Sequence, residues 1–344
     1  MRKKSQKRSV VVLLLLVAIL GFVVGAGYIC LYSNASDSEL HVRIDANTTY
    51  EDIVKQIRPA LRSEIHRYAF DICAKRFNLE NRHRNGTFDF DKDATIIDVV
   101  RKISRGDHIP VKLVVGTART LPHLAEKLAK QIEAEPDDLL AAMRDVELRK
   151  ELGFVKDSTI AMFIPNTYEV YSDITPEELM YRMHKEYKRF WNKSRVAKLE
   201  RCGLSQYEVM TLAAIVYEET KANEEMAAVA GVYINRLRKN MRLQADPTVK
   251  YAIGDFAMKR VMRKYLKYDS PFNTYVNKGL PPAPICIPSI AAIDAVLNYK
   301  EHDYFYFCAR PELDGRHNFA RTLDEHNVNA RKYADALNKQ GIKK

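Results

Sequence analysis

Apolar residues recur at helical spacing in the stretch that leads to Glu219. Four of them occupy positions i, i+3, i+4 and i+7, which form one face of a helix: Val209, Leu212, Ala213 and Val216. Ser205, followed three residues later by Glu208, has the pattern of a capping box and predicts that the helix begins there. Glu219 lies seven residues after Leu212 and continues the same face. The pattern therefore predicts a carboxylate on the apolar side of a helix end.

A second amphipathic helix is predicted directly after the first. Asn223 can cap its start, and its apolar positions again share one face: Met226, Ala230, Tyr233 and Leu237. This helix leads into a polar segment that Pro247 makes irregular. Three side chains able to hydrogen-bond stand in that segment: Gln244, Asp246 and Thr248. Because binding residues often lie on loops carried by a rigid scaffold, we expect a ligand site here.

Strand and helix patterns alternate between residues 40 and 115. HVRID, TFDFD and VKLVV are typical of strands, and TYEDIVKQI and TIIDVVRKI have helical spacing. The two helical pieces align as a weak internal repeat at an offset of 46 residues, with Thr49 against Thr95 and Ile57 against Ile103. This stretch is expected to form a small α+β module.

The rest of the chain combines helices with short strands. Residues 120–187 are mostly helical, and the loop Phe163–Tyr168 either packs Phe163 and Tyr168 into the core or belongs to a site. An exposed helix is predicted over residues 255–268, a helix over 289–298, a strand over 304–309 and a final helix that residues 325–327 enter. The predicted fold class is α+β.

The N-terminal region contains an uncharged apolar stretch from Val10 to Tyr32. Its length suits a helix that crosses about 30 Å of hydrocarbon. Five basic residues precede it, which predicts a cytoplasmic N-terminus and an exported remainder: Arg2, Lys3, Lys4, Lys7 and Arg8. A cleaved signal peptide is the alternative, with Gly25-Ala26-Gly27 as the cleavage site. Apolar residues continue to Tyr32, so we favour a retained single transmembrane helix.

Composition and charge narrow the class of protein. The chain has 344 residues, of which 47% are hydrophobic and 29% charged, which is typical of about two folded domains. The net charge of +11 suits an anionic surface or polymer. No basic run interleaved with aromatic residues is present, which argues against nucleic-acid binding.

Cysteine and histidine usage predicts no metal and no cofactor. Five cysteines include no pair at metal-ligand spacing, and they read as small buried hydrophobic residues. His317 and His326 could act as acid–base groups or as metal ligands, but no His-Glu-x-x-His spacing supports a metal site.

Glu219 is the candidate catalytic residue. A carboxylate that continues an apolar face is desolvated, which raises its pKa and allows it to hold a proton near neutral pH. The alternative is that Glu219 belongs to a solvated acidic cluster with Glu218, Glu224 and Glu225.

Several longer motifs resemble one family. IVYEET, INRLRKNMRLQADPTVKYAIG, NTYVNKGLPPAPICIPS, and HNF followed by EHN are similar to the YceG-like (MltG-type) family of endolytic murein transglycosylases. The resemblance is densest from about Leu212 to Asn327. In this family the catalytic glutamate directly precedes a threonine, and the matching pair in this sequence is Glu219 and Thr220. Two positions depart from the family pattern: Tyr217 stands where members often have Glu, and Asn166 stands where they usually have Asp.

The resemblance implies a domain layout and an activity. Residues 1–9 would be a cytoplasmic tail, 10–32 the transmembrane helix, 33–115 a LysM-like module that binds N-acetylglucosamine-type units, and 116–344 a mixed α/β YceG-like catalytic domain. A purely structural spacer remains the alternative for the module. Glu219 would cleave bonds between N-acetylmuramic acid and N-acetylglucosamine in nascent peptidoglycan strands, leaving 1,6-anhydro ends. The resemblance also suggests a place beside cell-wall synthases, and the Val10–Tyr32 stretch predicts that this place is the inner membrane.

The resemblance and the loop chemistry together imply which residues bind the sugars. They are Gln244, Asp246, Thr248, Asn273, Tyr275, Pro281, His317, Phe319 and Asn327. Two other functions stay open: a membrane-anchored peptidoglycan-binding scaffold with impaired catalysis, and a two-carboxylate hydrolase that pairs Glu219 with Asp246. A soluble globular protein of another class is a third alternative, against which the Val10–Tyr32 stretch argues.

Overall fold

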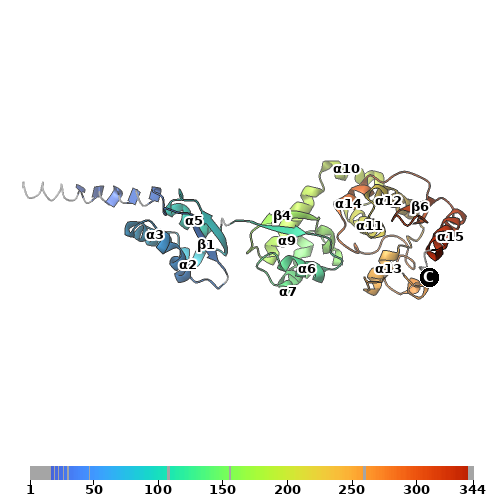
Figure 1. The fold of residues 1–344 in the computed structure, drawn as a ribbon, viewed down its shortest axis with the longest axis horizontal. Coiled ribbons are helices and arrows are strands. Elements are labelled where there is room, and N and C mark those ends of the chain that lie inside the picture. The colour runs from blue at the N-terminus through green and yellow to red at the C-terminus, as the bar shows by residue number, and fades with distance from the viewer. Residues whose placement is uncertain are drawn as a thin grey trace, which may run out of the picture. The chain divides into compact units, whose positions relative to one another are not determined.

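The computed structural model describes residues 17–339 except 19, 22, 26, 29–30, 46, 107–108, 155 and 259–260 (Figure 1). The chain divides into two compact units, one of residues up to 111 with 169–173, the other of 112–168 with residues from 174 onward. Within the described ranges, no helix combines the length and apolar composition that crossing a membrane requires. Much of the Val10–Tyr32 stretch lies outside the described residues.

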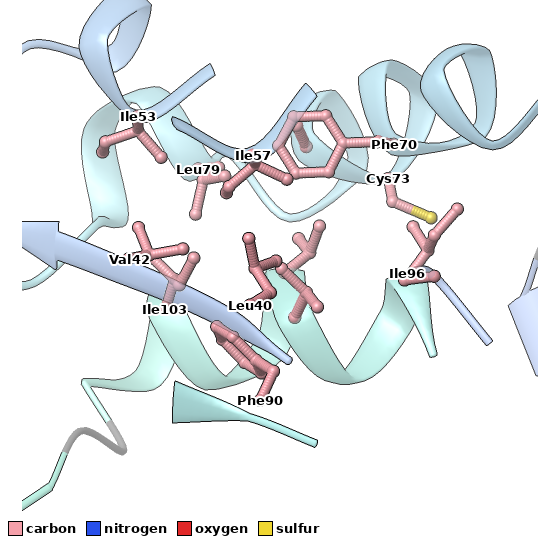
Figure 2. Packing of buried hydrophobic residues seen from close by; sticks show 14 of the residues in the cluster. Leu40, Val42, Ile53, Ile57, Phe70, Cys73, Leu79, Phe90, Ile96 and Ile103 are labelled. Atoms are coloured by element: carbon pink, nitrogen blue, oxygen red, sulfur yellow. The ribbon is translucent and has the colours of Figure 1, made fainter. Parts of the chain in front are cut away.

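The first unit packs helices on a two-stranded antiparallel sheet. β1 (Leu40–Ile44) pairs with β2 (Gly86–Phe90). The helices are α2 (Tyr50–Ile57), α3 (Glu64–Arg76), α4 (Leu79–Arg82) and α5 (Ile96–Arg105), with the 3-10 turn η1 (Arg58–Ala60). Figure 2 shows the core, to which β1 contributes Val42, α3 contributes Phe70 and α5 contributes Ile103. The alternating strand pattern sends every second residue of β1 into this core.

The internal repeat is visible in the caps of α2 and α5. Thr49 and Asp52 form a reciprocal capping box, and Thr95 and Asp98 form another. These local bonds explain why both helices were predictable. α3 and α4, which lie between the two repeats, were not predicted.

The first half of the second unit is helical around one small sheet. β3 (Val111–Val115) pairs with β4 (Asn166–Val170). Between and after them lie α6 (Leu121–Ala129), α7 (Pro136–Arg144), α8 (Val146–Glu151), η2 (Lys156–Met162) and α9 (Pro176–Phe190). The loop predicted at Phe163–Tyr168 runs into β4, and Phe163 and Tyr168 are buried. This outcome matches the core-packing alternative.

The second half of this unit carries the predicted helix pair. It contains α10 (Lys193–Cys202), α11 (Gln206–Glu219), α12 (Asn223–Arg238), α13 (Asp246–Ile253) and α14 (Ile290–Leu297). α11 packs against α12, α13 and α14 (Figure 1). β5 (Tyr306–Ala309) and β6 (His317–Ala320) form an antiparallel hairpin, on which α15 (Leu323–Lys339) packs.

Two local predictions were wrong. Asn223 is the first helical residue of α12 and not its cap; Ala222 holds the cap position without a side-chain bond. The helix predicted over residues 255–268 is instead a turn followed by the 3-10 segment η3 (Arg263–Lys267). Met258, Val261, Met262 and Tyr265 have helical spacing, but none of them is buried, so core packing does not fix a full helix here.

Candidate active site

Glu219 is the last residue of α11, and its side chain lines a cavity. The apolar stripe that predicts it is fully buried, and the Ser205–Glu208 capping box is present at the start of the helix. Tyr233 of α12 donates its hydroxyl hydrogen to Glu219 Oε1 at 2.7 Å. Tyr233 is itself buried and packs edge-on against Phe307, with ring centroids 5.8 Å apart. Three segments thus fix the orientation of the carboxyl group.

The surroundings of Glu219 raise its pKa to about 7. Burial is the main cause, because it disfavours the charged form. The Tyr233 hydrogen bond opposes this effect, and the negative charge of Asp246 adds to it. Lys250 and Arg236 lower the pKa by smaller amounts. A carboxyl group with this pKa can both give and take a proton near neutral pH.

The cavity beside Glu219 has a volume of about 430 Å³. Its walls come from α11, α12, α13, α15, the β5–β6 hairpin and the loops at Gln244 and Tyr275. The lining residues are Glu219, Tyr233, Arg236, Leu243, Gln244, Asp246, Tyr275, Tyr306, Phe307, Cys308, Ala309, His317, Leu323 and His326. A volume of this size falls in the range of small-ligand sites.

Four predicted binding residues line this cavity. They are Gln244, Asp246, Tyr275 and His317. The Tyr275 hydroxyl donates to Asp246 Oδ1 at 2.7 Å. Gln244 has a φ of 51°, a left-handed conformation that is uncommon for a residue other than glycine. Its backbone N–H donates to the carbonyl of Thr274 at 3.1 Å, which holds the exposed side chain at the cavity edge.

Two further predicted residues lie beneath these loops and hold them in place. The buried Thr248 hydroxyl bonds to Thr274 Oγ1 at 2.8 Å, and Thr274 Oγ1 accepts from the N–H of Ala245. Buried Asn273 donates to the carbonyls of Leu266 and Tyr268, and its Oδ1 accepts from the N–H of Tyr275 at 2.9 Å. Thr248 and Asn273 therefore position Gln244 and Tyr275 and do not line the cavity.

Three other predicted residues lie elsewhere. Pro281 is buried below its loop, and Phe319 of β6 packs with Tyr304 and His302. Asn327 is exposed on α15, where its carbonyl accepts from Arg331. None of the three lines the cavity.

The positions that depart from the family pattern also lie outside the cavity. Asn166 is exposed at the start of β4, and its Oδ1 accepts from the N–H of Thr167. Tyr217 stacks under Lys221, and Glu218 forms an ion pair with Arg119 at 2.8 Å.

Sequence reasoning missed Arg236 and Tyr306 as site residues and placed Tyr233 only on a buried face. Buried Arg236 donates to the carbonyl of Phe305 at 2.6 Å and to that of Leu243 at 2.7 Å, which joins α12, the Gln244 loop and the start of β5. Tyr306 stacks on His326, whose pKa is lowered by burial and by Arg236. The only signal for Arg236 was its place in the polar run that ends α12.

His317 forms a buried pair with Glu225 of α12. The distance between His317 Nδ1 and Glu225 Oε2 is 3.0 Å, and the side chains are 12% and 9% exposed. Glu225 Oε1 also accepts from the backbone N–H of His317 at 3.0 Å. The adjacent pair, Arg316 with Glu224, is solvent-exposed.

Two further observations concern a second cavity and the groups that could bind a metal ion. A second cavity of about 730 Å³, around Phe154 and Tyr187, has no carboxylate in its lining. Across the described part of the chain, His, Cys, Asp and Glu residues form no group of three that could hold a metal ion. The cavity at Glu219 contains the carboxyl group with the raised pKa and is the candidate active site.

Comparisons with known proteins show which family the chain is similar to. The model of the YceG-like family matches residues 42–332. A protein of Bacillus subtilis named endolytic murein transglycosylase is 28% identical over 271 residues, which cover 74% of each chain. A protein of the same name from Streptococcus pneumoniae is 28% identical over 180 residues, 50% of this chain and 32% of that one. A crystal structure of a yceG-like protein from Listeria monocytogenes has a TM-score of 0.56 and 28% identity, covering 85% of this chain and 99% of that one.

Proposed function

The chain belongs to the YceG-like family, and from this membership we propose that it is an endolytic peptidoglycan lytic transglycosylase. Relatives that carry the name endolytic murein transglycosylase support the proposal. The observation that carries it is Glu219, whose pKa of about 7 places a proton donor in a cavity lined with hydrogen-bonding side chains.

Cleavage begins with proton donation from Glu219. The protonated carboxyl group gives its proton to the glycosidic oxygen between N-acetylmuramic acid and N-acetylglucosamine, and the bond from that oxygen to C1 breaks. Positive charge develops at C1. The ionised Glu219 and the neighbouring Asp246 carboxylate stabilise this charge inside a partly desolvated cavity.

The second step closes an anhydro ring without water. The C6 hydroxyl of the same muramic residue attacks C1, and its proton returns to the Glu219 carboxylate. The product is a 1,6-anhydro end, and the enzyme regains its starting protonation state. One carboxyl group with a pKa near neutrality suffices for both transfers.

The cavity walls would orient the sugar. Gln244 and Tyr275 offer an amide and a hydroxyl from two loops joined by a backbone hydrogen bond, and Tyr306 adds an aromatic side chain to the wall. Sugars present hydroxyl groups and apolar C–H faces, so such walls recognise both. Arg236 holds the Gln244 loop and β5 at a fixed separation.

The finer assignments belong to the same proposal. Residues 10–32 would anchor the chain in the inner membrane with the N-terminus in the cytoplasm and the active site outside. Residues 33–115 would act as a LysM-like module on N-acetylglucosamine units. Cell-wall synthases would be neighbours, because nascent strands are the substrate. No nucleic acid or cofactor is part of the proposed reaction.

Product analysis tests the proposal. Uncrosslinked glycan strands are incubated with the full chain in water enriched in ¹⁸O, and the new chain ends are identified by mass spectrometry. A lytic transglycosylase gives 1,6-anhydro muramic ends without ¹⁸O. Reducing ends that carry ¹⁸O would replace the proposal with hydrolysis.

The hydrolase is a second candidate because Asp246 is close enough to raise the pKa of Glu219. Two carboxylates in one cavity are what an ordinary glycosidase requires. Tyr275 donates to Oδ1 of Asp246, and Oδ2 has no hydrogen-bond partner among the described residues, so it could bind a water molecule. Strands that bind without any new ends would instead indicate the scaffold alternative.

A further inference from the structure

The β5–β6 hairpin presents His317 to the cavity in a fixed orientation. Glu225 accepts from both the backbone N–H and the ring Nδ1 of His317, each at 3.0 Å. Phe307 packs edge-on against the imidazole ring, at 5.3 Å between centroids and 86° between planes. The ring is therefore held on two sides, by a carboxylate of α12 and by an aromatic neighbour on β5.

This arrangement determines which ring nitrogen carries the proton. A carboxylate can only accept hydrogen bonds, so Nδ1 must be the donor. In the neutral imidazole the other nitrogen, Nε2, is then an acceptor. Nε2 has no hydrogen-bond partner among the described residues, while His317 lines the cavity beside Glu219. An oriented acceptor without a protein partner is available to a ligand.

Several other polar residues of the cavity are already hydrogen-bonded or cannot accept, so this acceptor adds to those of Gln244 and Asp246. Tyr233 and Tyr275 already donate to Glu219 and Asp246, and Arg236 is a donor without acceptor capacity. A glycan offers hydroxyl hydrogens, which need acceptors. His317 Nε2 supplies one in the same cavity as Glu219 and Asp246.

We propose that the buried Glu225–His317 pair is a sugar-hydroxyl subsite of this cavity, in which Glu225 positions the imidazole so that Nε2 accepts a hydrogen bond from a hydroxyl group of the bound glycan. Glu225 is a positioning residue, and His317 is the group that contacts substrate. This inference deepens the proposed function and rests on it for the identity of the ligand.

Glu225→Gln is the variant that isolates the orientation. The amide keeps the shape and can still accept from the backbone N–H of His317. Its NH₂ group becomes a donor toward Nδ1, which favours the tautomer with the proton on Nε2 and turns the acceptor into a donor. Glu224→Gln is the matched control, since it changes the neighbouring exposed pair with Arg316 and leaves His317 untouched.

Two readouts are measured on the full-length chain. Long-range ¹H–¹⁵N spectra of ¹⁵N-histidine protein at about pH 8 report the protonated ring nitrogen, with the signal assigned by its loss in His317→Ala. Affinity for uncrosslinked glycan strands and kcat/KM for their cleavage report the subsite. We expect Nδ1–H in the unmodified chain, Nε2–H in Glu225→Gln, and a drop of about 10- to 100-fold in strand affinity or kcat/KM. Glu224→Gln should stay within about two-fold.

A double variant separates positioning from a merely structural role. In a His317→Ala background, Glu225→Gln should cost little more, because Glu225 acts through the imidazole. Equal loss in both backgrounds would overturn the inference, as would a proton on Nε2 in the unmodified chain. Thermal unfolding shows whether Glu225→Gln is folded. If it is not, His317→Ala alone tests the subsite, since unchanged strand affinity and cleavage in that variant would contradict it. If the chain binds strands but makes no anhydro ends, the proposed reaction is contradicted. The tautomer and the strand affinity then still test whether the Glu225–His317 pair is a sugar-hydroxyl subsite.

Discussion

The protonation of Glu219 depends on atoms that lie far from it in the sequence. Helical spacing predicts that its side chain continues an apolar face, and the structure places the half-buried side chain at the end of that face, in the cavity wall. The Tyr233 hydroxyl that contacts Oε1 comes from the next helix, and its direction depends on packing against Phe307. Local sequence could therefore predict a desolvated carboxyl group but not the hydrogen bond that tunes it.

Replacing Tyr233 by Phe tests this tuning. The hydroxyl stabilises the carboxylate form, so its loss should raise the pKa of Glu219 above about 7. The pH at which kcat/KM falls because Glu219 ionises should then rise by about one unit, which corresponds to the free energy of one hydrogen bond to a charged group. A pH profile of kcat/KM checks this, with Tyr306→Phe as a control in the same cavity. A fall in kcat/KM that stays at the same pH or moves to lower pH would contradict it.

The raised pKa also predicts how stability depends on pH. The folded state favours protonated Glu219, so this contribution is complete below about pH 4.5 and is lost as pH rises through about 7. Glu219→Gln removes the ionisation. Relative to the unmodified chain, the variant should gain up to about 3 kcal/mol in free energy of unfolding between pH 5 and pH 9. Denaturant unfolding at both values measures the change, and an equal difference at both would contradict a buried carboxyl group.

At the scale of the elements, helix starts were predictable where a capping box marks them, and the start of α12, which has no side-chain cap, was placed wrongly. The capping boxes at Ser205, Thr49 and Thr95 form within four residues, so sequence alone reveals them. Residues 255–268 failed because charge and propensity favour a helix that no core contact supports. Asn223 failed because Ala222 takes the cap position in the short turn between α11 and α12.

The close approach at Gly231 of α12 gives a prediction at this scale. A Cβ atom there would lie 2.3 Å from the carbonyl oxygen of Lys300 and 2.8 Å from His302 Nε2. Gly231→Ala should therefore destabilise the fold by about 2 kcal/mol, although alanine is the better helix former. Gly116→Ala is the matched control, because its Cβ would meet nothing within 4 Å. Unfolding midpoints of the two variants check the difference, which would vanish if α12 could shift without cost.

At the scale of the whole molecule, the candidate active site is assembled from segments between residues 219 and 326. Sequence reasoning pointed to loops that line this cavity, but it could not tell which polar side chains face it. Thr248 and Asn273 have the same chemistry as Gln244 and Tyr275, yet they bond to backbone and hydroxyl groups below the loops. That distinction depends on packing between α13, the Tyr275 loop and the β5–β6 hairpin, which no local pattern encodes. The layout of residues 1–9, 10–32, 33–115 and 116–344 stays a prediction.

The central claim is that Glu219 donates the proton that cleaves the glycan, and one comparison tests it most directly. The full chain, Glu219→Gln and Glu218→Gln are given uncrosslinked glycan strands, and the rate of appearance of anhydro ends is measured under single-turnover conditions. Glu218 is the matched control, since it pairs with Arg119 and does not line the cavity. We predict that Glu219→Gln loses about 10²- to 10⁴-fold in rate while still binding strands, and that Glu218→Gln remains within about ten-fold. Cleavage by Glu219→Gln at the unmodified rate would contradict the account.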